Sequence, residues 1–373
     1  MRTRNLLLAL LGVALIFTAA LAQSAAGTWS VESLDDGTVQ FSMKYRNDGS
    51  SWNHSNTTAA SKFEGLAEAL ERGGQGTFRL TRDAGTFAFD GSFSGGVGSG
   101  RWTFAQNPDF IRDMQALGYH NLSESRVLQM AMFDVSRQYV QGLKELGYEN
   151  VDADKLIAMR IHGVSLDYIR EMRGLGYRPS TDDLVAFRIH GVKPEIVREL
   201  NAAGYKDVPG DKLVAMRIHG VSPQLIRSFA ELGYSRPTID QLVSMRIHGV
   251  QPDFVRQLGA IGYRNIDIDD LIAMRIHGVS IDFIRGLAEL GYKDVALDNL
   301  VAMRIHGVST DFIRDLQQLG YRNVSVDQLV AMRIHGVNRR FIEEVRAAGY
   351  SDPSVDDLVN MRIHGIRRQM RQM

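Results

Sequence analysis

The chain has 373 residues, 44% of them hydrophobic, so it can bury a large core. Its 43 basic and 43 acidic side chains balance, and this balance gives no bulk attraction to nucleic acid or anionic lipid. The sequence has no cysteine, which excludes disulfides, thiolate catalysis, thiolate metal sites and a bacterial lipoprotein anchor.

The first 22 residues predict a secretory signal peptide. They combine Arg2 and Arg4 with an apolar run over residues 6–22 and a small-residue cleavage motif ahead of Gln23. We therefore expect cleavage after Ala22, a periplasmic or secreted location, and no membrane span in the mature chain. The alternative is an uncleaved membrane anchor, because the apolar run lies at the short end of what can cross a bilayer.

Residues 23–106 predict a small antiparallel β-rich module. Polar and apolar residues alternate over residues 39–43, 77–80 and 86–90, and glycine-containing turns separate such runs. One helix is expected over residues 62–71. Residues 47–58 are rich in Asn and Ser, and their polarity predicts a loop.

Residues 107–373 are dominated by an internal repeat. The string Arg-Ile-His-Gly recurs with successive copies 28 residues apart once and 29 residues apart six times, and the string Gly-Tyr recurs in step with it. A period of this length is typical of a solenoid of stacked helix pairs, and we expect about nine pairs. The predicted fold class is therefore α+β and multidomain, with a small antiparallel β module followed by an all-α solenoid of two-helix repeats.

The unit over residues 267–292 shows how each repeat forms two helices. The first, called helix A, is expected to begin after Asp267 as its N-cap and to stop at Gly278. The second, called helix B, is expected to begin after Ser280 and to stop at Gly291. Each helix has about ten residues, which is marginal alone in water, so neighbouring repeats must stabilise it.

The two helices differ in how much of their surface is apolar. Helix A is apolar over a wide arc that ends at Ile276, so we expect it to be the more buried member of the pair. Helix B is amphipathic, and its polar side carries Asp282, Arg285 and Glu289. These three residues are the candidate binding face.

An arginine recurs in the middle of the apolar arc of helix A, and an aspartate recurs near the start of that helix. The arginines are Arg160, Arg188, Arg217, Arg246, Arg275, Arg304, Arg333 and Arg362, and the aspartates are Asp154, Asp182, Asp211, Asp240, Asp269, Asp298, Asp327 and Asp356. A buried guanidinium needs partners, so we interpret these rows as a structural ladder between neighbouring units, in which the arginines bond carboxylates or the open carbonyls of a helix end. A row of anion-binding sites is the alternative.

A histidine stands at the end of each later helix A. The row consists of His162, His190, His219, His248, His277, His306, His335 and His364. In the last turn an imidazole can bond the terminal carbonyls and, when protonated, complement the helix dipole, so we interpret these residues as structural caps. The alternatives are pH sensing and metal binding, although equivalent residues of adjacent units should lie about 9 Å apart. The Gly-Tyr tyrosines are interpreted as packing residues rather than as a row for stacking a ligand.

The sequence carries no recognisable catalytic constellation. It contains no HExxH, GxSxG or GxxxxGK[ST] motif, so no residue is assigned a catalytic, cofactor or metal role. We expect a protein that is not an enzyme and that uses no cofactor. Paired helices also occur in DNA-binding proteins, but the balanced charge and the export leader oppose a nucleic-acid partner.

Three strings carry a resemblance to known proteins: LVAMRIHGVS, DFIRxLxxLGY and RDAGTFAFDGSF. With them the chain resembles a group of bacterial exported proteins that carry a small β module followed by short bihelical repeats. The repeats are also similar to those appended to some metallopeptidases of the beta-lactam-sensing type. This sequence lacks the zinc motif and the multiple membrane spans of those peptidases, so the resemblance implies no proteolytic function.

These observations predict a non-catalytic exported repeat scaffold that mediates protein–protein interaction. The sequence does not identify the protein partner. The alternative is a structural envelope protein that self-associates into oligomers or fibres, through its stacked repeats or the edges of the β module.

Overall fold

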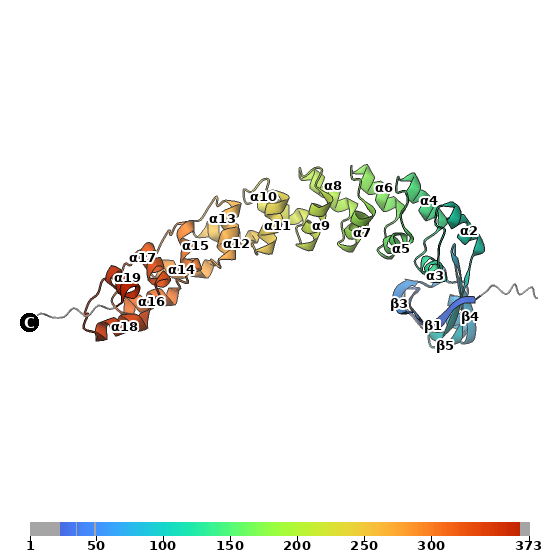
Figure 1. Cartoon of the computed structure of the whole chain (residues 1–373), viewed down its shortest axis with the longest axis horizontal. Coiled ribbons are helices and arrows are strands. Elements are labelled where there is room, and N and C mark those ends of the chain that lie inside the picture. Colours follow the sequence, from blue (N-terminus) through green and yellow to red (C-terminus); the bar gives the residue numbers. More distant parts are fainter. Residues whose placement is uncertain (1–22, 35, 48–49, 366–373) are drawn as a thin grey trace, which may run out of the picture. The chain divides into compact units, whose positions relative to one another are not determined.

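The computed structural model describes residues 23–34, 36–47 and 50–365 (Figure 1). The predicted signal peptide, residues 1–22, lies outside the described residues. The chain divides into two compact units, residues 1–188 and 189–373. The last strand ends at Gln106 and the first helix of the repeats begins at Pro108. The first unit contains the β-rich module together with the first helices, and the helix over residues 124–132 contacts the last two strands.

The β-rich module is a single antiparallel sheet. Its strands are β1 (Gln23–Ser33), β2 (Thr38–Asn47), β3 (Ser50–Ala59), β4 (Gly74–Arg82), β5 (Gly85–Ser94) and β6 (Val97–Gln106), in the order β3-β2-β1-β6-β5-β4. Between β3 and β4 the chain forms a short 3-10 helix (Ala60–Lys62) and α1 (Leu66–Arg72), which confirms the expected helix.

The predicted loop over residues 47–58 is wrong, because most of this segment forms strand β3. It pairs with β2 along its whole length, from Asn47 opposite Ser50 to Thr38 opposite Ala59. β3 lies at the edge of the sheet, where polar side chains can face water without loss of stability. Its composition therefore looks like that of a loop although its backbone is fully extended.

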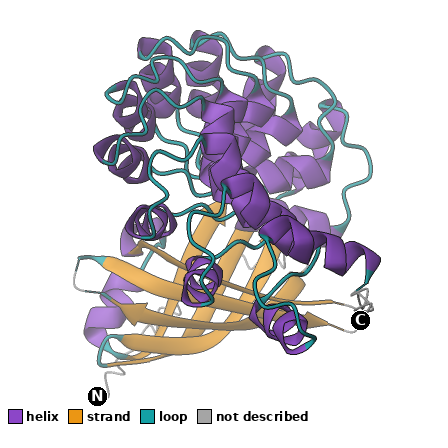
Figure 2. Cartoon of the chain, turned by 90° about the vertical axis from the view of Figure 1, so that its left-hand side faces the viewer, coloured by secondary structure: helices purple, strands orange, loops and turns teal. Residues whose placement is uncertain are grey.

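The sheet curls so that its inner face closes on itself. Trp29 of β1 and Phe78 of β4 are not on neighbouring strands, yet their ring centroids lie 4.8 Å apart. Phe78 also stacks on Phe89 at 4.4 Å, and both phenylalanines are buried. Glycine at position 91 allows this closure, because a Cβ there would lie 2.7 Å from the Trp29 ring. Figure 2 shows the strands crossing as the sheet folds over.

The rest of the described chain alternates B and A helices. The B helices are α2 (Pro108–Ala116), α4 (Arg137–Glu145), α6 (Leu166–Gly174), α8 (Pro194–Ala202), α10 (Pro223–Ala230), α12 (Pro252–Ala260), α14 (Ile281–Glu289), α16 (Thr310–Gln318) and α18 (Arg339–Ala347). The A helices are α3 (Glu124–Met132), α5 (Ala153–Ile161), α7 (Thr181–Ile189), α9 (Gly210–Ile218), α11 (Ile239–Ile247), α13 (Ile268–Ile276), α15 (Leu297–Ile305), α17 (Val326–Ile334) and α19 (Val355–His364). The described residues thus contain the nine pairs that the repeat count predicts.

The helix ends follow the predicted signals, with one exception. Gly278 adopts φ +72° and Gly291 adopts φ +97°, the left-handed conformation that ends each helix at glycine. The Ser280 hydroxyl accepts a hydrogen bond from the Phe283 amide at 3.1 Å, which caps α14. Asp267 occupies the N-cap position of α13, but its side chain makes no capping bond.

Within each unit, A helices pack beside A helices and B helices beside B helices, in two layers. The buried side chains between the layers include Leu271 and Met274 of helix A and Leu287 of helix B. Each short helix therefore gains its stability from its neighbours in the stack.

Candidate functional site

The arginines of the A helices bond neighbouring repeats, but not through the recurring aspartates. The guanidinium of Arg275 lies over the Phe254 ring of the preceding B helix, with its carbon 5.0 Å from the ring centroid. The same cation–π contact joins Arg160 to Tyr139, Arg188 to Tyr168, Arg304 to Phe283, Arg333 to Phe312 and Arg362 to Phe341. A ring rather than a carboxylate therefore lies opposite most of these cations.

Five arginines of this row, including two that contact no ring, donate to an open carbonyl at the end of the preceding A helix. Arg246 Nε donates to the carbonyl of His219 at 3.1 Å. Equivalent bonds run from Arg160 to Phe133, from Arg188 to His162, from Arg217 to His190 and from Arg362 to Gly336. Five of the eight arginines thus bond a carbonyl, whereas the Nε atoms of Arg275, Arg304 and Arg333 have no hydrogen-bond partner within the described residues. Asp134 is an additional carboxylate partner of Arg160, at 3.1 Å.

The aspartates lie at the opposite end of the A helices, exposed in the first turn. The sequence left open whether the arginines bond carboxylates or carbonyls of neighbouring units. The recurring aspartates do not face them, because Asp269 lies in the first turn of its A helix and Arg275 in the last. Where the aspartates have partners, these come from the preceding A helix: Arg126 to Asp154, Lys155 to Asp182, Lys212 to Asp240 and Gln328 to Asp356. Within the described residues, Asp269, Asp298 and Asp327 make no side-chain hydrogen bond or ion pair.

The histidines occupy the C-cap position, as predicted, but their imidazoles do not form the predicted capping bonds. His277 has φ −90° and ψ 6°, and its amide donates to Ala273 within the helix. In the part of the chain that the structure describes, none of the eight imidazoles makes a hydrogen bond. The row's contribution to the ladder is its backbone carbonyl, which any residue type would supply. Hydrogen bonding therefore does not account for histidine here.

The tyrosines connect successive repeats. Tyr292 Oη donates to the carbonyl of Val324 at 2.7 Å, 32 residues further along the chain. The same bond recurs from Tyr119 to Val151, Tyr148 to Pro179, Tyr205 to Pro237, Tyr234 to Ile266, Tyr263 to Val295 and Tyr321 to Pro353. Burial raises the pKa of the Tyr292 phenol above its usual value, so the hydroxyl stays protonated as a donor.

An exposed row of isoleucines is the feature that sequence reasoning missed. Ile276 was expected in the buried arc of helix A, but 52% of it is exposed. The same holds at every equivalent position, with Ile161, Ile189, Ile218, Ile247, Ile305, Ile334 and Ile363 all between 48% and 55% exposed. The signal that could have found it is the motif itself, since Ile precedes His in all eight copies while other positions vary.

In the second unit these residues form a continuous band across the A helices, which we call the A-face. The A-face comprises the exposed side of α9, α11, α13, α15, α17 and α19. Each helix places its aspartate at one edge, its isoleucine and histidine near the other edge, and partly exposed small apolar residues such as Val301 and Ala302 between them. The band is therefore acidic along one edge and apolar over its centre.

The opposite layer presents a different surface. Asp282, Arg285 and Glu289 are exposed on α14, as the sequence predicts. The position of Glu289 changes along the stack: it is Ala in α8, Glu just after α10, Ala in α12 and Gln in α16. The position of Arg285 is instead arginine from α6 to α16, at Arg170, Arg198, Arg227, Arg256 and Arg314. At least one exposed position of helix B thus varies, while the aspartate, isoleucine and histidine of the A-face repeat.

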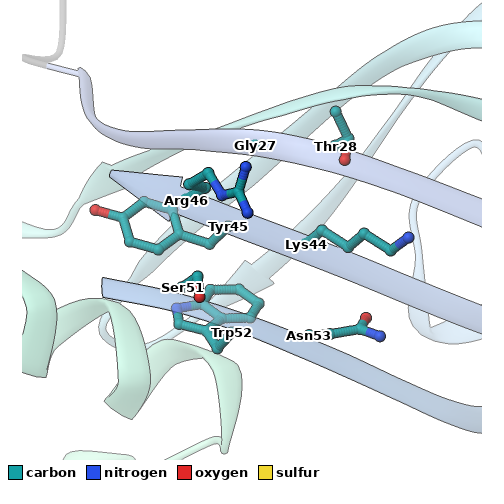
Figure 3. Close-up of a pocket in the computed structure, with 8 residues that line it drawn as sticks. All are labelled: Gly27, Thr28, Lys44, Tyr45, Arg46, Ser51, Trp52 and Asn53. Atoms are coloured by element: carbon teal, nitrogen blue, oxygen red, sulfur yellow. The ribbon is translucent and has the colours of Figure 1, made fainter. Parts of the chain in front are cut away.

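The β-rich module carries a shallow pocket at the ends of β1, β2 and β3 (Figure 3). Lys44, Arg46 and Asn53 line it together with the rings of Tyr45 and Trp52, which stack with centroids 5.5 Å apart. All the polar side chains in its lining are exposed. The lining has no group that is both buried and aimed into the pocket, so it is a weaker candidate than the A-face.

The same module docks on the first helices through an ion-pair cluster. Asp83, in the turn between β4 and β5, accepts hydrogen bonds from the Arg137 side chain and amide at the start of α4. Arg137 also bonds Asp113 of α2. In addition, His54 of β3 packs edge-on against Phe133 of α3, with centroids 5.4 Å apart. Sequence reasoning could not identify these partners, because they lie 24 to 79 residues apart along the chain.

No three His, Cys, Asp or Glu side chains gather into a metal-binding group within the described ranges. None of the helices described is long and apolar enough to cross a membrane. Comparison with known protein families finds no match to this sequence, and comparison with curated proteins finds no similar sequence.

Proposed function

We propose that this protein is a non-catalytic, exported scaffold that binds another protein through the A-face. The observation that carries the proposal is the row of half-exposed isoleucines, one on every repeat from Ile161 to Ile363. Large apolar side chains that repeat at a surface position, where the core does not require them, are typical of a contact surface.

The variation between the two layers supports this choice of face. The repeats have diverged at the exposed Glu289 position of helix B, so their shared origin alone does not keep every exposed position identical. Isoleucine and histidine remain unchanged on the A-face, although the His277 imidazole makes no hydrogen bond to any described residue and half of Ile276 is exposed. Recognition of an external surface by each repeat explains why both are retained.

The first repeat gives an internal example of docking at this position. Met132 and Phe133 of α3 stand where later repeats have Ile and His. Both line a groove with Trp52 and His54 of β3, and Phe133 contacts the His54 ring. The side chains at this position, which are exposed in later repeats, therefore contact strand β3 in the first repeat.

The test compares capture by two variants of the mature chain. A triple variant, Ile247→Ser, Ile276→Ser and Ile305→Ser, should lose the partner proteins that the wild-type chain retains from an extract of its native compartment. A control variant on helix B, Asp282→Asn and Glu289→Gln, should keep them. Equal capture by all three proteins would contradict binding at the A-face.

The alternative, self-assembly, is separated by light scattering over a concentration series. A constant monomer mass is expected for a scaffold, whereas mass that grows with concentration and that the isoleucine variant abolishes would favour a structural envelope protein. Export is tested by intact mass of the secreted or periplasmic protein, which should begin at Gln23. Retention of Met1 would instead indicate a membrane anchor.

A further inference from the structure

We infer that the A-face of the second unit accommodates a basic amphipathic α-helix of the partner protein, lying across the A helices. The inference rests on the proposed function and adds the chemistry of the partner. It depends on three properties of the face: its charge, its periodicity and its width.

The charge along one edge is acidic and largely unneutralised. Six exposed aspartates form this edge: Asp211, Asp240, Asp269, Asp298, Asp327 and Asp356. Asp270 and Asp357 add further carboxylates in the same first turns. The loops before these helices carry Arg264, Lys293 and Arg322, but no ion pair joins them to the row within the described residues. A partner with cations along one flank would meet this edge.

The spacing of the A-face isoleucines fits a helical ligand better than an extended strand. Helices that pack side by side are about 8–10 Å apart, so successive isoleucines repeat at about this distance along the stack. An α-helix brings the same side to the surface every seven residues, or about 10.5 Å. A strand repeats one face at about 6.8 Å, which drifts out of step with the rungs.

The width of the band agrees with one helix. Asp269 and Ile276 lie seven residues apart on α13, a rise of about 10 Å along that helix. A helix with its side chains is about 10–12 Å across. A single partner helix can therefore contact the isoleucine row with its apolar stripe while its flank reaches the aspartate edge.

The charge of the edge disfavours a second copy of the same face. A second copy would bring another row of aspartates rather than the cations that this edge attracts.

The experiment uses three labelled synthetic peptides with the full mature chain. The first is an amphipathic helix of about four heptads with leucine on one stripe and lysine on one flank. The second has glutamate in place of lysine. The third has proline at every third position with the same leucine and lysine content, because a polyproline helix also repeats at about 9.3 Å. Binding is followed by fluorescence anisotropy at low and high salt.

The lysine helix should bind about tenfold more tightly than the glutamate helix at low salt, and the difference should shrink at high salt. A variant with Asp269→Asn, Asp298→Asn and Asp327→Asn should lose this preference. The variant with Ile247→Ser, Ile276→Ser and Ile305→Ser should bind neither helix. The control with Asp282→Asn and Glu289→Gln should behave as wild type. Circular dichroism and thermal melting should show that all variants remain folded.

Several outcomes would overturn the inference. These are equal binding of the lysine and glutamate helices, an unchanged preference in the aspartate variant, binding retained by the isoleucine variant, or tighter binding of the proline peptide. Failure of the broader proposal is distinguishable. If captured proteins still require the isoleucines but the lysine helix does not bind, the partner chemistry is wrong and the scaffold stands. If neither the captured proteins nor the lysine helix requires the isoleucines for binding, both the proposed function and the inferred partner chemistry are wrong.

Discussion

At the scale of single residues, the arginine ladder shows how a cation is accommodated beside a core. Arg275 lies over Phe254, and its Nε has no hydrogen-bond partner within the described residues. The positive charge of Arg275 must then be stabilised by the Phe254 ring and by solvent at the partly exposed end of the side chain. A partly exposed cation–π contact contributes less than a buried ion pair, whose loss can cost about 3–5 kcal/mol.

We predict a coupling free energy of about 0.5–1 kcal/mol between Arg275 and Phe254 in a double-mutant cycle. The substitutions are Arg275→Leu and Phe254→Leu, and the free energy of unfolding is measured by chemical denaturation. Arg217 is the matched control, because the position equivalent to Phe254 is Ile196 in its preceding B helix. The Arg217→Leu and Ile196→Leu pair should show no comparable coupling. Equal coupling in the two cycles would contradict the ring contact.

His54 makes the β-rich module sensitive to mild acid. Its burial lowers the pKa of the imidazole below 6.5, and Lys62 and Arg82 line the same cavity. The unfolded chain therefore binds a proton at His54 more readily than the folded chain does. Stability from this residue is fully present above about pH 6.5 and falls as the pH drops below it.

We expect the free energy of unfolding of the wild type to decrease between pH 7.5 and pH 5.5, and His54→Phe to remove part of that decrease. The measurement is denaturation followed by tryptophan fluorescence, which reports on Trp29, Trp52 and Trp102. His277→Phe, at a C-cap in the second unit, serves as the control and should leave the pH dependence of this signal unchanged. If His54→Phe follows the wild-type pH profile, the burial of His54 does not affect stability.

At the scale of elements, the tyrosine bond fixes the distance between successive helix pairs. Tyr292→Phe removes the donor to the Val324 carbonyl and leaves the ring in place. We expect a loss of about 1 kcal/mol in the free energy of unfolding. Hydrogen exchange should show faster opening in the two repeats that the bond joins. Unchanged exchange in both repeats would mean that the ring alone holds them together.

The sequence could predict the helices well because their limits are set locally. Glycine at positions 278 and 291 ends a helix through its own backbone conformation, and this signal recurs in every repeat except after α3, where Asp134 adopts φ +56° in its place. The strand β3 could not be predicted in this way, because its polar side chains reflect its place at a sheet edge rather than its backbone. Composition indicates exposure, and an exposed segment can be a loop or an edge strand.

The candidate site depended on relations between repeats, which periodicity in one helix does not contain. Ile276 lies at the end of an apolar arc, and the spacing of neighbouring A helices decides whether that end is covered. The partner of Arg275 is likewise a ring of the preceding repeat. The residue types and their recurrence were visible in the sequence, whereas which rows were buried and which were exposed required the structure.

At the scale of the whole molecule, the repeats should be removable in whole units. Deletion of residues 268–296 joins Asp267 to Leu297, which stands at the position of Ile268 in the next repeat. Arg304 would then lie over Phe254 instead of Phe283. We expect a folded protein with the same helical content per residue and a modestly lower melting temperature by circular dichroism.

The control deletes residues 280–293, which removes one helix B and leaves two A helices in succession. The A and B helices no longer alternate, and the layer of B helices is interrupted. Adjacent repeats should therefore lose protection in hydrogen exchange. If this half-unit deletion melts as cooperatively as the whole-unit deletion, the helix pair is not the unit of stability.

The tyrosine bonds and the arginine ladder share a property that matters while the chain is being made. Each links residues 20 to 32 positions apart, so a repeat needs only the next stretch of chain to complete its contacts. Loops of this length close at small entropic cost, and folds built from near contacts form quickly. A chain that emerges with its amino end first can therefore fold progressively. Each helix pair can form its contacts as soon as the following pair has emerged, before the last residue of the chain has done so.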